Sequence, residues 1–346
     1  MFETLGLEMS PQTASVWFGL ILGLAFGALA MLTRFCLRRA LVGPVEDRSE
    51  ARGVWALALA VAVLGTQGFV AAGLVSFEAH RFHAEPVPVV GLVVGGLLFG
   101  LGTVLARGCL SRLTILSASG NLRALVAILV AAVAAHATLQ GALAPLRMAL
   151  GSVTVSLGSV LPGAGWIWAA VIAGLALLVV LRSRISVPML LGGALIGALV
   201  PVAWVGTGYV LYDEFDAIPI EGLAFTGPWA EALFWGVAAS VTTAGFGAGL
   251  IGGVLAGAFA AAILSRRFAW ESFDSAGQMG RSLGGATLMG VGGVLAGGCT
   301  VGAGLAGLPT LGIAALIAFA AVVAGILGAD AVLNRRGLGR GIVPAE

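Results

Sequence analysis

The sequence predicts an all-α polytopic membrane protein in which residues 1–346 form a single integral membrane domain. Of the 346 residues, 59% are hydrophobic and 10% are charged, whereas a soluble domain carries about 25% charged residues. Several uncharged apolar runs have the length of about 20 residues that a membrane-spanning helix needs. Their apolar positions do not alternate with polar ones, so the runs are not strands of a membrane β-barrel. The net charge of +2 is too small to indicate a nucleic-acid partner.

The first span is predicted at residues 15–33, where a glycine recurs at every fourth position from Gly19. This spacing lines one helix face with small residues and lets a neighbouring backbone approach closely, so we expect a packing face. Residues 1–15 are acidic and lack the basic region of a signal peptide, so the span should stay in the membrane. Five arginines between positions 34 and 52 place the next loop on the cytoplasmic side and the N-terminus outside.

The remaining spans alternate between acidic and arginine-rich loops. They are predicted at 53–75, 89–106, 124–144, 165–181, 187–208 and 310–329. The run 232–264 is interpreted as a half-length re-entrant piece followed by a full helix. Acidic loops at 77–88 and 209–231 are placed outside, and the last arginines keep the C-terminus in the cytoplasm. The prediction is therefore about nine transmembrane helices plus re-entrant helices.

Two ten-residue segments of the chain repeat each other. Gly100–Cys109 reads GLGTVLARGC and Gly290–Cys299 reads GVGGVLAGGC, with seven of ten positions identical at an offset of 190 residues. We interpret them as an internal duplication that brings two cysteines to equivalent places. In the predicted topology the two segments are approached from opposite sides of the membrane, which indicates an inverted repeat. The predicted units are a first half at 15–145, connecting spans at 165–208 and a second half at 231–329.

The glycines around Cys299 disfavour a regular helix, because each costs about 1 kcal/mol relative to alanine. We expect a helix that ends at Gly297–Gly298 and leaves peptide N–H groups beside Cys299, where they attract anions. Arg107 adds positive charge beside Cys109. A thiol with an ordinary pKa of about 8.5 is neutral at pH 7. Such a weak S–H donor suits transient contact with an anion that has a terminal sulfur atom.

Other polar residues give negative or open predictions. His80 and His83 lie in a predicted outer loop and are expected to be exposed and incidental. His136 and Gln140 share one helix face, so they either line a path or bridge two helices. The three cysteines are far apart and none has a histidine nearby in sequence, so neither a metal site nor a cofactor is predicted.

Four segments of the chain resemble the YeeE/YedE family of sulfur-compound permeases. They are RFCLRRA at 34–40, LARGCLSR at 105–112, FGAGLIGGVLAGAF at 246–259 and GGCTVGAGLAG at 297–307. The resemblance covers nearly the whole chain. It implies an hourglass-shaped protein with a pseudo-twofold repeat and re-entrant helices. It also implies thiosulfate uptake across the bacterial inner membrane, with the anion handed along Cys36, Cys109 and Cys299 by S–H···S contacts.

The motifs and the resemblance together give a predicted substrate pathway. It consists of Cys36, Cys109, Cys299, Gly108, Gly298, Arg107 and Thr300. The expected partners are thiosulfate or a similar sulfur anion, the lipid bilayer and, at the arginine-rich cytoplasmic face, a TusA-like soluble sulfur carrier.

Three alternatives to a thiosulfate permease stay open. Some members of the family are linked to selenium, so the cargo could be a selenium compound. A membrane sulfurtransferase would form a persulfide on Cys36, with Arg34 and Arg38 activating the thiol. No general base stands near any cysteine in sequence, so we predict that the protein is not an enzyme and has no catalytic residue. In the third alternative the glycine pattern serves only helix packing.

Overall fold

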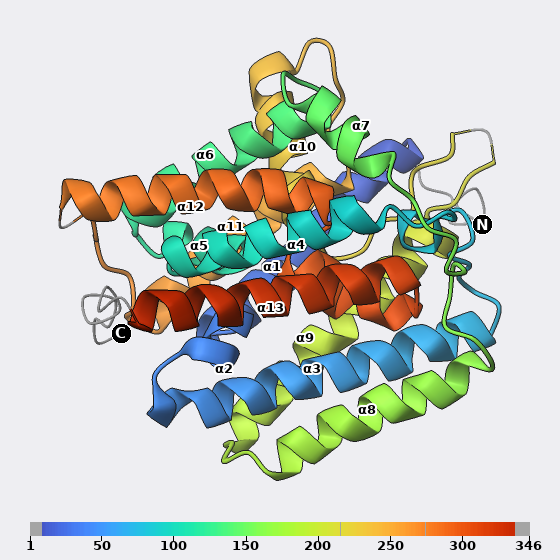
Figure 1. Ribbon diagram of the computed structural model, residues 1–346, viewed down its shortest axis with the longest axis horizontal. Helices are drawn as coiled ribbons and strands as arrows, with labels where there is room; N and C mark the ends of the chain where they lie inside the picture. Colours follow the sequence, from blue (N-terminus) through green and yellow to red (C-terminus); the bar gives the residue numbers. More distant parts are fainter. Residues whose placement is uncertain (1–8, 215, 274, 336–346) are drawn as a thin grey trace.

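The protein is a bundle of helices, most of which run along the horizontal axis of Figure 1. The computed structural model describes residues 9–214, 216–273 and 275–335. Among these residues there are helices, turns and isolated bridges but no strands. The first helices are α1 (Pro11–Thr33), α2 (Leu37–Val42), α3 (Val45–Ala71), α4 (Val89–Leu105), α5 (Leu110–Ala118), α6 (Leu122–Leu139) and α7 (Ala144–Gly151). The later ones are α8 (Gly165–Leu181), α9 (Val187–Val205), α10 (Thr226–Ala238), α11 (Phe246–Leu264), α12 (Ala276–Leu295) and α13 (Ile313–Arg335).

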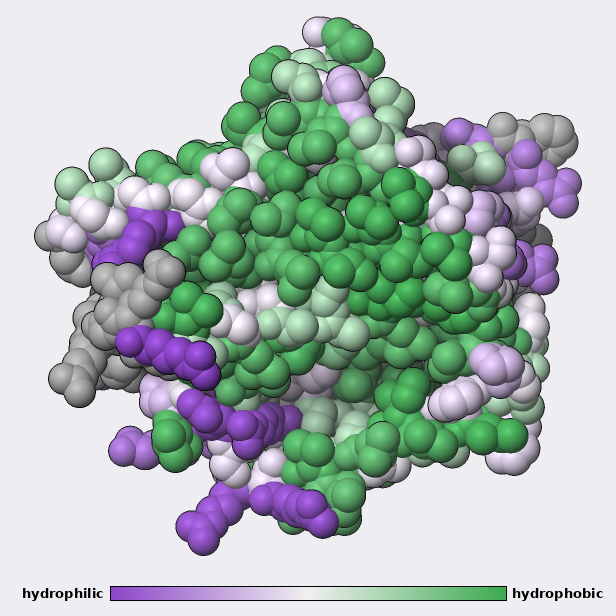
Figure 2. Space-filling view, in the orientation of Figure 1, coloured by the Kyte–Doolittle hydropathy of each residue, from purple (hydrophilic) through white to green (hydrophobic). Residues whose placement is uncertain are grey.

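The helices confirm an all-α polytopic membrane protein. In the described part of the chain, eight helical stretches are long and apolar enough to cross a membrane, and α8 is a shorter apolar helix of 17 residues. Figure 2 shows the corresponding surface, on which hydrophobic residues cover the middle and hydrophilic residues gather toward the ends. α1 begins near one end of the bundle and α13 finishes at the other (Figure 1).

The glycines of α1 form the expected packing face, and α11 is its partner. A methyl group on Gly19, Gly23 or Gly27 would overlap the backbone of α11, at Phe246, Leu250 and Val254 respectively. Both series of residue numbers rise together, so the two helices are parallel. The every-fourth glycines of α11 meet α1 in the same way, and the two backbones therefore lie in direct contact.

The two repeated segments lie on α4 and α12, which cross antiparallel. Gly102 on α4 lies against Gly285 and Met289 of α12. Gly292, the residue equivalent to Gly102, lies against Gly95 and Phe99 of α4, and these are the equivalents of Gly285 and Met289 at the offset of 190. This reciprocity is the contact pattern that a local twofold axis between the two helices predicts. The wider division into halves and the hourglass shape stay predictions.

Several boundaries differ from the sequence-based ones. α3 begins at Val45 rather than at 53, because its first turns carry Asp47 and Glu50, whose carboxylates lie 3.3 and 3.7 Å from the Arg39 guanidinium. The run 232–264 contains the last part of a short helix, α10, which begins earlier at Thr226, and the full-length helix α11; the re-entrant course of the first piece stays a prediction. The short helices α2, α5 and α7 were not predicted, since they are too brief for an apolar period to reveal them.

Candidate functional site

Each of the three cysteines follows the same kind of break in the chain. Two residues before each thiol the backbone is left-handed: Arg34 (φ 52°) before Cys36, Arg107 (φ 62°) before Cys109 and Gly297 (φ 69°) before Cys299. Each cysteine is then extended and precedes the first residue of the next helix, which is α2, α5 or a π-helical segment at Thr300–Gly307. The helix that precedes Cys299 thus ends at Leu295 with a break at Gly297, as expected.

The turn at Arg34-Phe35-Cys36 is a third copy that lies outside the two repeated segments. A left-handed conformation costs a residue other than glycine about 1–2 kcal/mol, so the turn must be held by its surroundings. The amide of Phe35 donates to the carbonyl of Ala30, which closes the end of α1. The signal that could have identified it is an apolar helix followed by an arginine, one further residue and a cysteine, as at Arg107-Gly108-Cys109.

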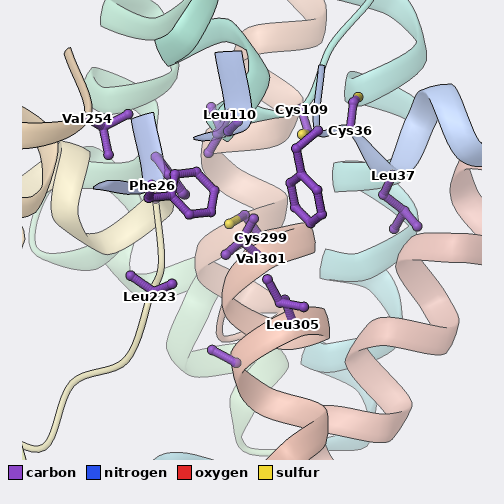
Figure 3. Close-up of a cluster of buried hydrophobic side chains, with 14 of the residues drawn as sticks. Phe26, Cys36, Leu37, Cys109, Leu110, Leu223, Val254, Cys299, Val301 and Leu305 are labelled. Carbon is purple, nitrogen blue, oxygen red and sulfur yellow. The ribbon is translucent and has the colours of Figure 1, made fainter. Parts of the chain in front are cut away.

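The breaks bring all three thiols into one cluster of buried apolar side chains (Figure 3). Cys36, Cys109 and Cys299 have 7%, 1% and 0% of their surface exposed, and none of them forms a disulfide. The thiols therefore face the interior of the bundle and not the lipid.

Cys109 contacts both Cys36 and the residue that follows Cys299. Its side chain interacts with that of Cys36, from the other arginine-containing turn. Its Sγ lies 3.2 Å from the Ser111 hydroxyl oxygen. It also interacts with the side chain of Thr300, the residue that follows Cys299. The structure thus places the predicted residue Thr300 between the two repeated motifs, and Ser111 is a polar contact that the sequence did not single out.

Cys299 lies among backbone amide groups. Its Sγ accepts a hydrogen bond from the Gly302 amide at 3.3 Å, and the amides of Val301, Phe225 and Thr226 also lie at the thiol. The peptide N–H groups that the sequence predicts beside Cys299 are therefore present. Amides from two separate segments converge there, so an anion at this thiol would meet several N–H donors at once.

The two predicted motif glycines differ in how strictly glycine is required. A methyl group on Gly298 would lie 2.7 Å from the backbone nitrogen of Ala303, and neither atom can turn aside. A methyl group on Gly108 would lie 3.3 Å from the end of the Leu113 side chain, which can adjust. Glycine is thus sterically needed at the second motif but only favoured at the first. Arg107 is half-buried at the end of α4.

A cavity of about 900 Å³ opens on the acidic side of the bundle, the end that we predict to be outside. We call it the outer cavity. Its wall comes from α1, α6, α10, the chain around His80 and the segment before α10. The charged residues in its lining are Arg81, Glu221 and Glu231. Both His136 and Gln140 line it, and the His136 ring also stacks on Phe234 at 4.6 Å. His136 thus packs against α10, as one interpretation expects, while a role of the two residues in a substrate path stays a prediction.

The outer cavity shifts the ionisation of its acidic and basic groups. Burial, reinforced by the Glu231 carboxylate, raises the pKa of Glu221 to about 7, while Arg81 acts in the opposite direction. Burial lowers the pKa of His80 to about 3 and also lowers the pKa of Arg81. At pH 7, Glu221 is therefore half protonated and His80 is neutral.

The expectation that both loop histidines are exposed and incidental is wrong. His80 and His83 are half-buried. The Nδ1 atom of His80 accepts a hydrogen bond from the Phe82 amide at 3.3 Å, and the Nε2 atom of His83 lies 2.9 Å from the carbonyl oxygen of Thr310. The loop folds inward because Phe82, only 2% exposed, packs against the second cysteine motif.

A thin partition separates the outer cavity from Cys299. It is the segment Ala224–Pro228. Ala224, Gly227 and Pro228 line the cavity, whereas the amides of the intervening Phe225 and Thr226 lie at the thiol. One stretch of backbone therefore touches solvent-accessible space on one side and the sulfur atom on the other.

Comparison with known proteins agrees with this arrangement. Residues 32–327 match the protein family described as sulphur transport. The chain is similar to the thiosulfate transporter TsuA of Escherichia coli (strain K12), with 28% identity over 317 residues, which cover 83% of this chain and 86% of that protein. It is also similar to the thiosulfate transporter TsuA of Spirochaeta thermophila, with 27% identity over 319 residues, 88% of this chain and 94% of that protein. The matched region includes all three cysteine turns and both cavity carboxylates, and the chain belongs to the YeeE/YedE family of sulphur transport proteins.

Proposed function

We propose that the protein is a membrane permease that takes up thiosulfate or a closely related sulfur anion. The observation that carries the proposal is the cluster of three buried thiols, in which Cys109 contacts Cys36 and Thr300 while Cys299 lies directly behind the partition of the outer cavity. Its relatives are named as thiosulfate transporters, and an anion with a terminal sulfur is the cargo that neutral thiols suit best.

The proposed path runs from the outer cavity to Cys299, then to Cys109 and last to Cys36. The cavity delivers the anion to the partition at Ala224–Pro228, which must move aside for passage. Amides at Cys299 then offset its negative charge, while the thiols offer weak S–H···S contacts that release as readily as they form. Gly298 keeps the backbone close to this point, and Thr300, the residue after Cys299, contacts Cys109.

The membrane setting follows from the same proposal. We place the protein in the bacterial inner membrane, with the N-terminus outside and the C-terminus in the cytoplasm, because arginines dominate the loops at the end where α13 finishes. Cys36 then lies nearest the cytoplasm. A TusA-like soluble sulfur carrier could receive the anion there, beside a basic pocket lined by Arg48, Arg52 and Arg182.

Uptake measurements test the proposal. The wild-type protein in cells or liposomes should accumulate labelled thiosulfate, and both Cys109→Ala and Cys299→Ala should lose most of this activity. Ser265→Ala is a matched control, because it deletes one atom whose hydrogen bond, to Ala261, stays within α11. Uptake that is unchanged in both cysteine variants would remove the thiols from the mechanism. Competition with sulfate, sulfite and selenium analogues identifies the preferred anion.

The contact between Cys36 and Cys109 supports one second candidate, a membrane sulfurtransferase. A thiolate of Cys36 would attack the outer sulfur of thiosulfate, form a persulfide and release sulfite as the leaving group. The contact with Cys109 and burial oppose this ionisation of Cys36, and the charge of Arg112 offsets only part of that cost. Intact mass after exposure to thiosulfate separates the two functions. A stable gain of about 32 Da, one sulfur atom, favours transfer, and an unchanged mass during active uptake favours passage.

A purely structural role for the glycines makes a different prediction. Replacing Gly298 by a larger residue would then lower the amount of folded protein and leave the transport rate per molecule unchanged. The permease proposal requires the opposite, a normal amount of protein with reduced uptake for at least one substitution at Gly298 or Thr300.

A further inference from the structure

The outer cavity carries an unusual balance of charge for the entrance of an anion permease. Its lining holds one cation, Arg81, and two carboxyl groups, Glu221 and Glu231. With both carboxylates ionised the net charge of the lining is −1, which repels a dianion. With Glu221 protonated the net charge of the lining is zero, and Glu221 no longer offsets the positive charge of Arg81.

Arg81 is held next to the thiol cluster. Its guanidinium lies 5.3 Å from the centre of the neighbouring Phe82 ring. Phe82 in turn packs against Gly297 and Gly307, which flank Cys299 in the second motif. Arg81 and Cys299 interact electrostatically, so the cation lies close to the second cysteine motif.

Arg81 also has donors to offer. Its side chain is exposed to the cavity although protein surrounds it. Among the described residues no carboxylate comes within 4.0 Å of its guanidinium, so it forms no ion pair there. Glu221 acts on it only through space. A guanidinium with free donors in a low-dielectric recess is a strong site for a tetrahedral oxyanion.

We propose that the outer cavity is the capture site for a small tetrahedral dianion, that Arg81 binds the anion, and that Glu221 competes with the anion for Arg81. This proposal rests on the proposed function, because it identifies where the permease first holds its cargo. Glu231 is a lesser competitor, since its carboxylate already accepts the Gly245 amide at 3.1 Å, at the start of α11.

The competition makes capture depend on the outside pH. The ionisable groups that face Glu221 across the cavity are His80 and Arg81 on the inward loop, His136 on α6 and Glu231 on α10. α1 contributes the uncharged side chains of Gln12 and Ser15. Because Glu221 has a pKa of about 7, its protonated fraction falls about tenfold between pH 6 and pH 8.

Proton and anion must then bind cooperatively. A proton on Glu221 raises the affinity of the cavity for a dianion, so by reciprocity a bound dianion raises the affinity of Glu221 for a proton. Because Glu221 is already half protonated at pH 7, anion binding takes up at most about half a proton per molecule from the solution, whether or not transport follows.

Two measurements test the capture site. Initial uptake of labelled thiosulfate into cells, at a concentration well below saturation, should fall roughly tenfold as the outside pH rises from 6 to 8. In Glu221→Gln the rate should stay high and nearly flat across this range. In Arg81→Gln it should be low at every pH, and Arg81→Lys should recover part of it. Glu78→Gln, on the same loop but outside the cavity lining, should keep the wild-type profile.

The second measurement does not require transport. A pH indicator should report proton uptake when thiosulfate, or sulfate as an analogue without the terminal sulfur atom, binds to the purified wild-type protein at pH 7. It should report no uptake with Glu221→Gln. A wild-type pH profile in Glu221→Gln, or wild-type anion affinity in Arg81→Gln, overturns the capture site. If neither the wild type nor any variant takes up thiosulfate, but anion binding still consumes protons, the permease proposal fails and the capture site stands. Normal elution of each variant on size exclusion shows that it is folded.

Discussion

Two neighbouring glycines on α12 offer a matched test of how tightly the repeated helices cross. A methyl group added at Gly285 would lie 2.7 Å from the nitrogen of Ala106, 2.7 Å from the carbonyl oxygen of Gly102 and 2.9 Å from Leu105 Cβ. All three contacts belong to the α4 chain and cannot swing away. A methyl group added at Gly284 meets no atom within 4 Å.

The pair separates packing from helix propensity. Alanine stabilises a helix by up to about 1 kcal/mol relative to glycine, and this gain is common to Gly284→Ala and Gly285→Ala. At position 285 the added atom forces α4 and α12 apart, and such overpacking costs about 1–3 kcal/mol. The difference between the two variants is therefore about 1–3 kcal/mol. For a chain of this size that corresponds to a gap of roughly 2–6 °C in Tm.

Thermal unfolding in detergent, followed by size-exclusion fluorescence, measures this gap. Gly284→Ala should unfold at or above the wild-type temperature, and Gly285→Ala clearly below it. Equal Tm values for the two variants would refute the close crossing of α4 and α12, and with it the reciprocal contacts that suggest a twofold axis.

Three further predictions concern stability. Burial raises the pKa of Glu221 from 4.5 to about 7, so between these pH values the folded protein keeps a proton that the unfolded chain loses. The Tm of the wild type should therefore fall relative to that of Glu221→Gln as the pH rises from about 4.5 to 7. Parallel plots of Tm against pH for the two proteins would contradict this. Trp229→Phe removes the hydrogen bond that Nε1 donates to the Thr114 hydroxyl at 2.8 Å, between two buried side chains, and should cost about 1–2 kcal/mol in thermal stability, whereas no loss would mean that the bond does not form. Asn121→Ala removes the side-chain oxygen that accepts the Ala124 amide at 2.8 Å at the start of α6, together with the hydrogen bond that Nδ2 donates to Glu271, and should cost about 1 kcal/mol, with Asn121→Ser retaining most of the cap.

Features that depend on the local sequence were predicted well. The span at 165–181 coincides with α8, and 15–33 lies within α1. Glycines at every fourth position of α1 imply a neighbouring backbone, because a helix face without side chains lets another helix approach into backbone contact. The break before Cys299 was predictable because a pair of glycines ends a helix and Gly297 can adopt a positive φ at low cost.

Features that depend on packing between distant segments were not predictable. Nothing near Cys36 in the sequence indicates that its thiol meets that of Cys109, because their contact is set by how α2 and α5 dock. The left-handed conformation of Arg34 does not follow from its residue type, since arginine seldom adopts a positive φ. In the sequence, Glu221 is one of several acidic residues in the loop at 209–231 that is predicted to lie outside. Its raised pKa comes from burial beside Glu231, which is ten positions later in the chain and on another element.

The reciprocal crossing of α4 and α12 has a consequence for how such a protein can be assembled. Each of the two helices presents equivalent residues to the other, with Gly102 against Gly285 and Gly292 against Gly95, so one surface pairs with its own copy running in the reverse direction. Two identical short chains inserted in the lipid in opposing directions would make this same contact without any linker between them. Fusion into one polypeptide then frees each copy to change on its own, as the arginine at 107 opposite the glycine at 297 illustrates.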